Sequence, residues 1–142
     1  MIGNYATATT FKWTPGTGRS GYIQRMLINI EDVGSFDSAA YGNNITLTNG
    51  ISIGVFDSGG TIMTDVVDSH NIKTNADWAM HCHDVTVHDF GLGNETLTAR
   101  WTFAKSGQPL WVPSGGHYFG VVLNDDFSGL VNHNIHLQGW EQ

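Results

Sequence analysis

Short segments in which hydrophobic and polar residues alternate recur along the whole chain. Alternation with a period of two residues is typical of a β-strand that has one buried and one exposed face. Between these segments lie PGTGRSG, TNG, DSGG, GLGN, KSGQ and PSGG, which are rich in residues that form tight turns. The pattern predicts eight to ten strands within YATATTFKW, YIQRMLINI, NITLT, ISIGVFD, TIMTDVVD, DVTVHDF, ETLTARWTF, PLWVP, YFGVVLN and NIHLQGW.

The order of these segments predicts an all-β fold. No helical pattern of the length that connects parallel strands separates them, so we expect an antiparallel β-sandwich of the jelly-roll type. KTNADWAM, which Thr74 or Asn75 can cap, and SFDSAAYG are predicted as short helices at the ends of the sandwich. Residues 11–142 are expected to form a single domain, and residues 1–10 an N-terminal arm or edge strand.

The letters GTGRSG at residues 16–21 match the G-x-G-x-x-G pattern that binds the pyrophosphate of a dinucleotide. That role requires a buried parallel strand before the glycines and a helix after them. The run that follows, YIQRMLINI, also fits a strand, in which Tyr22, Met26, Ile28 and Ile30 lie on one face. We therefore interpret GTGRSG as a hairpin loop.

Charge and composition narrow the classes of partner. The net charge is −7, from 6 Lys and Arg against 13 Asp and Glu, which argues against a nucleic-acid partner. No run approaches the roughly 20 apolar residues that cross a bilayer, so no membrane partner is expected. The single cysteine, Cys82, excludes an intrachain disulfide, and we expect it to be a buried or half-buried structural thiol.

The histidines in HCHDVTVH and HNIH suggest one candidate site. On a strand, His81 and His83 would share a face, as two imidazole ligands do in β-barrel metalloenzymes. A cupin-like metal site would need further ligands from other strands, such as His136 or Glu95. These ligands would converge only if the strand register happened to bring them together. We therefore favour an interpretation in which the histidines are hydrogen-bonded to neighbouring backbone. We expect neither a metal nor another cofactor.

No catalytic motif such as G-x-S-x-G or a P-loop is present. Acid–base chemistry or Ca²⁺ binding could use Asp125 and Asp126, or Asp57, Asp65 and Asp68 elsewhere. Turns such as NDDFSG select aspartate in any case, because its side chain bonds to nearby backbone. We therefore expect turn roles for these residues and no enzymatic activity.

Five tryptophans raise the hypothesis of a surface that stacks on sugars. Trp101 and Trp111 lie among hydrophobic residues of predicted strands, so we expect them in the core or in a subunit interface. Trp13 and Trp140 lie near the two ends of the sequence, where interface packing and glycan contact fit equally well. With Tyr5, these two residues are the interface candidates.

Four stretches resemble small decoration (cement) proteins on the capsids of tailed bacteriophages: ITLTNGISIGVFD, IKTNADWAM, YFGVVLNDDFSGL and WTP. The similarity spans about residues 11–140, and its motifs are structural rather than catalytic. The resemblance implies a jelly-roll-like sandwich on the capsid surface of the virion. It also implies a homo-oligomer, often a trimer, that binds the major capsid protein and has no enzymatic activity.

Two alternatives stay open beside that resemblance. A glycan-binding sandwich of a phage fibre or adhesion apparatus would present exposed tryptophan in a cleft, whereas a cupin-like metalloprotein would gather histidines in a barrel mouth. The uncharged N-terminal segment MIGNYATATT is expected to add as an arm or edge strand to a neighbouring subunit.

Overall fold

The computed structural model of the chain describes residues 2–3, 9–32, 47–67, 71–89, 95–128 and 130–142. In these parts the helical elements are α1 (Asn75–His81) and a 3-10 turn, η1 (Phe103–Ser106). The strands are β1 (Ile2–Gly3), β2 (Thr9–Trp13), β3 (Gly21–Asp32), β4 (Ile51–Phe56), β5 (Ile62–Asp65), β6 (Asp84–Asp89), β7 (Glu95–Thr102), β8 (Leu110–Val112), β9 (Tyr118–Leu123) and β10 (Asn132–Glu141).

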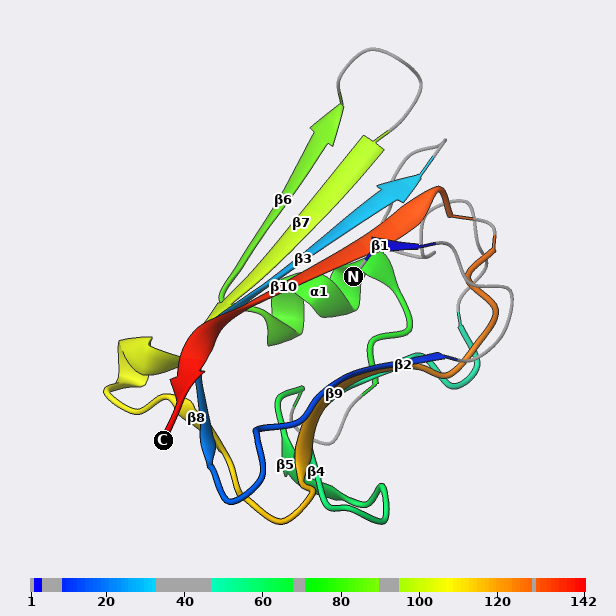
Figure 1. The fold of residues 1–142 in the computed structure, drawn as a ribbon. Coiled ribbons are helices and arrows are strands. Elements are labelled where there is room, and N and C mark those ends of the chain that lie inside the picture. The colour runs from blue at the N-terminus through cyan, green and yellow to red at the C-terminus, as the bar shows by residue number, and fades with distance from the viewer. Residues whose placement is uncertain (1, 4–8, 33–46, 68–70, 90–94, 129) are drawn as a thin grey trace.

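The strands form two antiparallel sheets that pack as two layers (Figure 1). The larger sheet has the order β1-β10-β3-β7-β6, and β8 pairs with β3 beyond the end of β7. The smaller sheet has the order β2-β9-β4-β5. The all-β, antiparallel sandwich predicted from the alternating pattern is therefore confirmed.

Strands from the two ends of the chain pair with each other. β1 pairs with β10 in the larger sheet, and β2 pairs with β9 in the smaller sheet. This nested order supports the jelly-roll subtype, which stays a prediction. Residues 2–3 form an edge strand on β10 of the same chain. Strand β2 begins at Thr9, so it crosses the boundary that we expected between the arm (residues 1–10) and the domain (residues 11–142).

Nine of the predicted strand segments overlap an observed strand, and NITLT, at residues 44–48, lies mostly outside the described residues. The segment KTNADWAM contains helix α1, as predicted. Its N-terminus is held by Asp77, whose Oδ2 accepts hydrogen bonds from the backbone N–H groups of Lys73 (2.7 Å) and Thr74 (2.9 Å). The second predicted helix, SFDSAAYG, lies outside the described residues.

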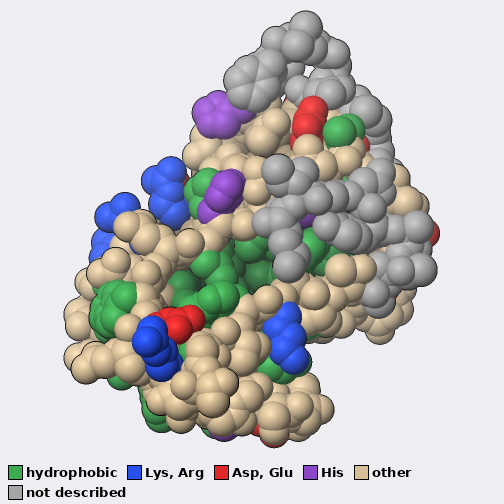
Figure 2. All heavy atoms as spheres, viewed as in Figure 1, with side chains coloured by type: hydrophobic (Ala, Val, Ile, Leu, Met, Phe, Trp, Pro, Cys, Tyr) green, Lys and Arg blue, Asp and Glu red, His purple; other side chains and the backbone are tan. Residues whose placement is uncertain are grey.

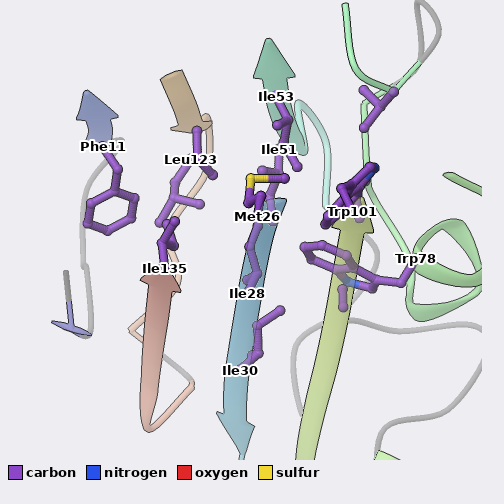
Figure 3. Close-up of a cluster of buried hydrophobic side chains, with 14 of the residues drawn as sticks. Phe11, Met26, Ile28, Ile30, Ile51, Ile53, Trp78, Trp101, Leu123 and Ile135 are labelled. Atoms are coloured by element: carbon purple, nitrogen blue, oxygen red, sulfur yellow. The ribbon is translucent and has the colours of Figure 1, made fainter. Parts of the chain in front are cut away.

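Hydrophobic side chains from the inner faces of both sheets fill the interior (Figure 3). Because alternate residues of a strand point to opposite faces, each inner strand contributes every second residue to this core. Helix α1 adds Trp78, whose ring lies edge-on to Trp101 with 6.0 Å between centroids. The core residues of three inner strands include Met26, Ile28 and Ile30 of β3, Leu97, Ala99 and Trp101 of β7, and Phe119, Val121 and Leu123 of β9.

The GTGRSG segment forms a turn that leads from β2 into β3. Gly18 has a φ of 75°, and the Arg19 N–H donates to the carbonyl oxygen of Gly16 at 2.9 Å. A strand follows the glycines instead of a helix, so the dinucleotide-binding geometry is not formed. The hairpin prediction was nevertheless wrong, because β2 and β3 belong to different sheets. Alternation predicts where a strand lies but not which sheet it joins.

The core assignment predicts opposite outcomes for two tryptophans that lie in neighbouring strands. We expect Trp101→Ala to lower the free energy of unfolding by about 3–5 kcal/mol, because removal of a buried indole leaves a cavity. The matched control is Trp111→Ala, which should change it by less than about 0.5 kcal/mol, since surface substitutions are mild. The exposed fractions are 1% for Trp101 and 54% for Trp111. Urea denaturation measures both changes, and equal losses would contradict the assignment.

Candidate functional site

A β-bulge in β3 changes which side chains reach the surface at one end of the larger sheet. Gln138 of β10 pairs with Arg25, but the next residue, Gly139, pairs with Ile23. Gln24 is therefore an extra residue on β3 that has no opposite residue on β10. An extra residue of this kind reverses the alternation of inward and outward side chains on one side of the bulge.

The bulge turns Tyr22 outward. Ile23 and Met26 are both buried in the core although three positions separate them, so Tyr22 lies on the outer face. The sequence-based expectation that Tyr22 shares a face with Met26, Ile28 and Ile30 was therefore wrong. Strict alternation cannot predict a bulge, because the extra residue is defined by pairing with another strand.

Tyr22 is the centre of a row of three aromatic side chains, which we call the aromatic row (Trp111, Tyr22 and Trp140). Tyr22 pairs with Trp140 on β10 and with Trp111 on β8, so the three residues share the outer face. The Tyr22 and Trp140 rings are stacked, with centroids 5.3 Å apart and planes at 14°. Trp140 is 43% exposed and Trp111 is 54% exposed, which excludes the core position that we considered for Trp111.

Polar side chains border the aromatic row on the same outer face. Gln138 precedes Trp140 by two residues and pairs with Arg25, which in turn pairs with Thr102 of β7. Gln138 and Arg25 are exposed, and Thr102 is half-buried. These residues, here called the polar row (Gln138, Arg25 and Thr102), place an amide, a guanidinium group and a hydroxyl beside the rings.

A hydrophobic groove lies between β10 and β2, where the edges of the two sheets face each other. Figure 2 shows hydrophobic side chains gathered in a hollow on this side of the molecule. One part has a volume of about 300 Å³ and is lined by Trp13, Ile23, Leu137, Gly139, Trp140 and Glu141. The adjoining part has a volume of about 240 Å³ and is lined by Phe11, Lys12, Trp13, Phe119, Val121, Ile135 and Leu137.

The groove brings together two of the three interface candidates. Trp13 and Trp140 come from near opposite ends of the sequence and line the same cavity. The Trp13 ring crosses from the smaller sheet to Gly21 of β3, where a Cβ atom would lie 2.3 Å from the ring. Glycine at that position therefore makes room for the indole. The third candidate, Tyr5, lies outside the described residues.

One side of β10 has an open strand edge next to this groove. β10 pairs with β3 from Asn132 to Glu141, but β1 covers its other side only at His133 and Asn134. Along residues 136–140, no strand of the described chain pairs with that second side. An edge of this kind can accept a strand from another molecule.

The histidine candidates for a metal site do not converge. His81 is the last residue of α1, His83 precedes β6, and His136 is exposed on β10. His83 Nδ1 accepts a hydrogen bond from the Thr102 N–H at 2.7 Å. Within the described ranges, no group of three or more His, Cys, Asp or Glu side chains is placed to hold a metal ion. The placement of His81 and His83 on one strand face was wrong, because the helix extends to His81.

The aspartates in turns bond to nearby backbone, as their turn chemistry predicts. Asp57 Oδ1 accepts a hydrogen bond from the Thr61 N–H at 2.8 Å, and this bond is the main cause that lowers the pKa of Asp57. Asp126 Oδ1 accepts from the Ser128 N–H at 2.8 Å in the same way. Asp125 differs, because its Oδ2 accepts at 2.6 Å from the N–H of Gly50, which lies far away in the sequence. Asp68 lies outside the described residues.

Cys82 is half-buried, and burial raises the pKa of its thiol. Its Sγ donates to the backbone oxygen of Asp84 at 3.2 Å. A thiol with a raised pKa is a poor nucleophile, so these contacts fit the expected structural role.

No protein-family model, curated protein or solved structure matches the chain. Among the helices in the described ranges, none combines the length and the apolar character needed to cross a bilayer. Exposed hydrophobic side chains gather on two surfaces that meet at Trp140, the aromatic row and the groove, and this exposure makes them the candidates for function.

His133 is buried in the core, where its ring lies edge-on to Phe127 with 5.2 Å between centroids. Burial lowers the pKa of His133 from 6.5 to about 4. Between these two values the unfolded chain binds more protons than the folded one, so stability falls as the pH drops through this window. The neutral imidazole is thus the form that the fold accommodates.

We expect His133 to account for about 3 kcal/mol of the stability lost between pH 7 and pH 4, as an order of magnitude. Urea denaturation across this range should show a weaker pH dependence for His133→Leu than for the unchanged protein. His136→Gln, which alters an exposed histidine, serves as the control and should leave the dependence unchanged. An identical pH profile for His133→Leu and the unchanged protein would contradict the assignment.

Proposed function

We propose that the protein is a non-enzymatic structural protein of a bacteriophage virion. In this role it decorates and stabilises the capsid through contacts with its own copies and with the major capsid protein. The observation that carries the proposal is the open hydrophobic groove between β10 and β2. The nested strand order and the sequence resemblance to decoration proteins support the same function.

The groove has the chemistry of a protein interface. Trp13, Leu137 and Trp140 line it and stay partly exposed, and Leu137 has an exposed fraction of 37%. Large exposed hydrophobic residues that gather in one place mark surfaces that bind other proteins. Glu141 is also among the lining residues, and such a charged group resembles the polar rim around a hydrophobic interface centre.

The open edge of β10 adds a directional component to such contacts. Residues 136–140 of β10 can pair with a strand from a neighbouring molecule, while hydrophobic side chains of that strand enter the groove. Backbone hydrogen bonds would fix the register of the partner, and burial of the groove would supply most of the favourable free energy. The groove thus supports assembly better than it supports binding of a small substrate.

Assembly should depend on Leu137, which lines both parts of the groove. We expect the unchanged protein to be an oligomer, most simply a trimer, in light scattering coupled to size exclusion. Leu137→Asp should shift it towards the monomer, because the interface would bury an unpaired carboxylate. Val87→Asp alters an exposed residue of β6, at the opposite edge of the larger sheet, and should leave the oligomer intact. A monomeric unchanged protein, or an oligomeric Leu137→Asp variant, would contradict this assembly.

The location on the virion can be measured directly. In quantitative mass spectrometry of purified particles, we expect a copy number comparable with that of the major capsid protein. A much lower copy number would place the protein at the neck or tail and contradict the decoration role. Absence from the particles would remove the virion function altogether.

A further inference from the structure

We propose that the aromatic row and the polar row together form a carbohydrate-binding site. The ligand would be an oligosaccharide of pyranose units that lies across β8, β3 and β10, with its ring faces on the exposed Trp111 and Trp140, and with Tyr22 between them as the support of Trp140. This site is separate from the proposed assembly groove, although Trp140 contributes to both.

The shape of the aromatic row fits an extended, flat ligand. The three residues occupy one register row on three adjacent strands, so their backbones span two strand spacings, about 10 Å. The Tyr22 ring stacks against the Trp140 ring and supports it, while Trp111 and Trp140 stay exposed to solvent. The C–H faces of pyranose rings stack on exposed aromatic rings, so Trp111 and Trp140 can contact different units of one oligosaccharide.

A second stacked pair in the protein shows what a purely structural arrangement looks like. Phe56 and Tyr118 lie on the outer face of the smaller sheet, with centroids 5.1 Å apart, and both side chains are buried. The ammonium group of Lys12 lies 4.1 Å from the centroid of the Tyr118 ring. The aromatic row has a similar stack but leaves Trp111 and Trp140 open to solvent. Stabilisation of the fold alone does not account for that exposure.

The polar row supplies the hydrogen-bonding groups that a sugar needs beside the rings. Arg25 and Gln138 are exposed and lie directly beside the aromatic row. Their planar groups present several directed hydrogen-bond donors, and Gln138 also offers an acceptor. A pyranose ring carries apolar C–H faces and hydroxyl groups at its rim, so it can use both rows at once.

The site is built on a rigid part of the fold. β3 pairs with β10 on one side and with β7 and β8 on the other, which fixes the position of Tyr22. At the bulge, a Cβ atom on Gly139 would lie 2.0 Å from the carbonyl oxygen of Tyr22, so only glycine allows this close approach. A surface that is ordered before the ligand arrives loses little conformational entropy on binding.

The test begins with the complete protein on an array of malto-, cello- and chito-oligosaccharides and oligouronates. The best binder is then titrated by calorimetry. We expect Trp111→Ala to weaken binding at least about tenfold, because one stacking ring is lost, and Trp111→Phe to retain most of the affinity. Arg25→Ala should weaken binding of oligouronates more than of neutral sugars, since it removes the cation.

The control variant is Leu137→Asp, which should disturb assembly while the titrated sugar still binds. Trp111→Ala should behave in the opposite way and retain the oligomer, so failure of this site and failure of the assembly groove give different results. The proposal is overturned if the folded protein binds none of these sugars at millimolar concentration. It is also overturned if Trp111→Ala binds as tightly as the unchanged protein, or if this variant loses only the oligomer, which would make the aromatic row a protein interface.

Discussion

Continuous pairing of β3 on both of its sides is the constraint on which the rest of the structure depends. β10 covers one side of β3, while β7 and β8 share the other, so segments from distant parts of the sequence are aligned on a single strand. The inward residues of β3 enter the core, and its outward residues set the chemistry of the outer face. The aromatic row exists because Tyr22 stands between strands that carry Trp111 and Trp140. The groove exists because β10 extends past the short strand β1.

Alternation of hydrophobic and polar residues was sufficient to predict most strands and the sandwich, whereas helix α1 was predicted from its capping residue, Thr74. This pattern reports which side of a strand is buried, and burial is a local property that each segment carries by itself. It failed where pairing between strands decides the outcome. Tyr22 points outward because of a bulge, Trp111 is exposed although hydrophobic residues flank it, and GTGRSG joins two sheets instead of two paired strands. Register and sheet membership are properties of the assembled fold, so no single segment encodes them.

The candidate sites were predictable to a smaller degree than the fold. Trp13 and Trp140 were selected because they are aromatic residues near the two ends of the sequence, and they line one cavity. Trp111 and Tyr22 were missed as surface residues, since only cross-strand pairing places them beside Trp140. His81 and His83 were grouped because they are close in sequence, yet one ends a helix and the other precedes a strand. Proximity in sequence is a weak guide to a site that several strands build together.

The extra residue in β3 also bears on how related sequences should be compared. A one-residue deletion at Gln24 would join Ile23 directly to Arg25, so strict alternation would leave Tyr22 on the outer face without a bulge. An alignment gap at this position would therefore leave inside and outside unchanged for the start of the strand. In a chain that keeps Gln24, pairing without the bulge would instead turn Tyr22 towards the interior space that Trp13 fills, so the bulge decides whether this end of the sheet presents aromatic rings to solvent.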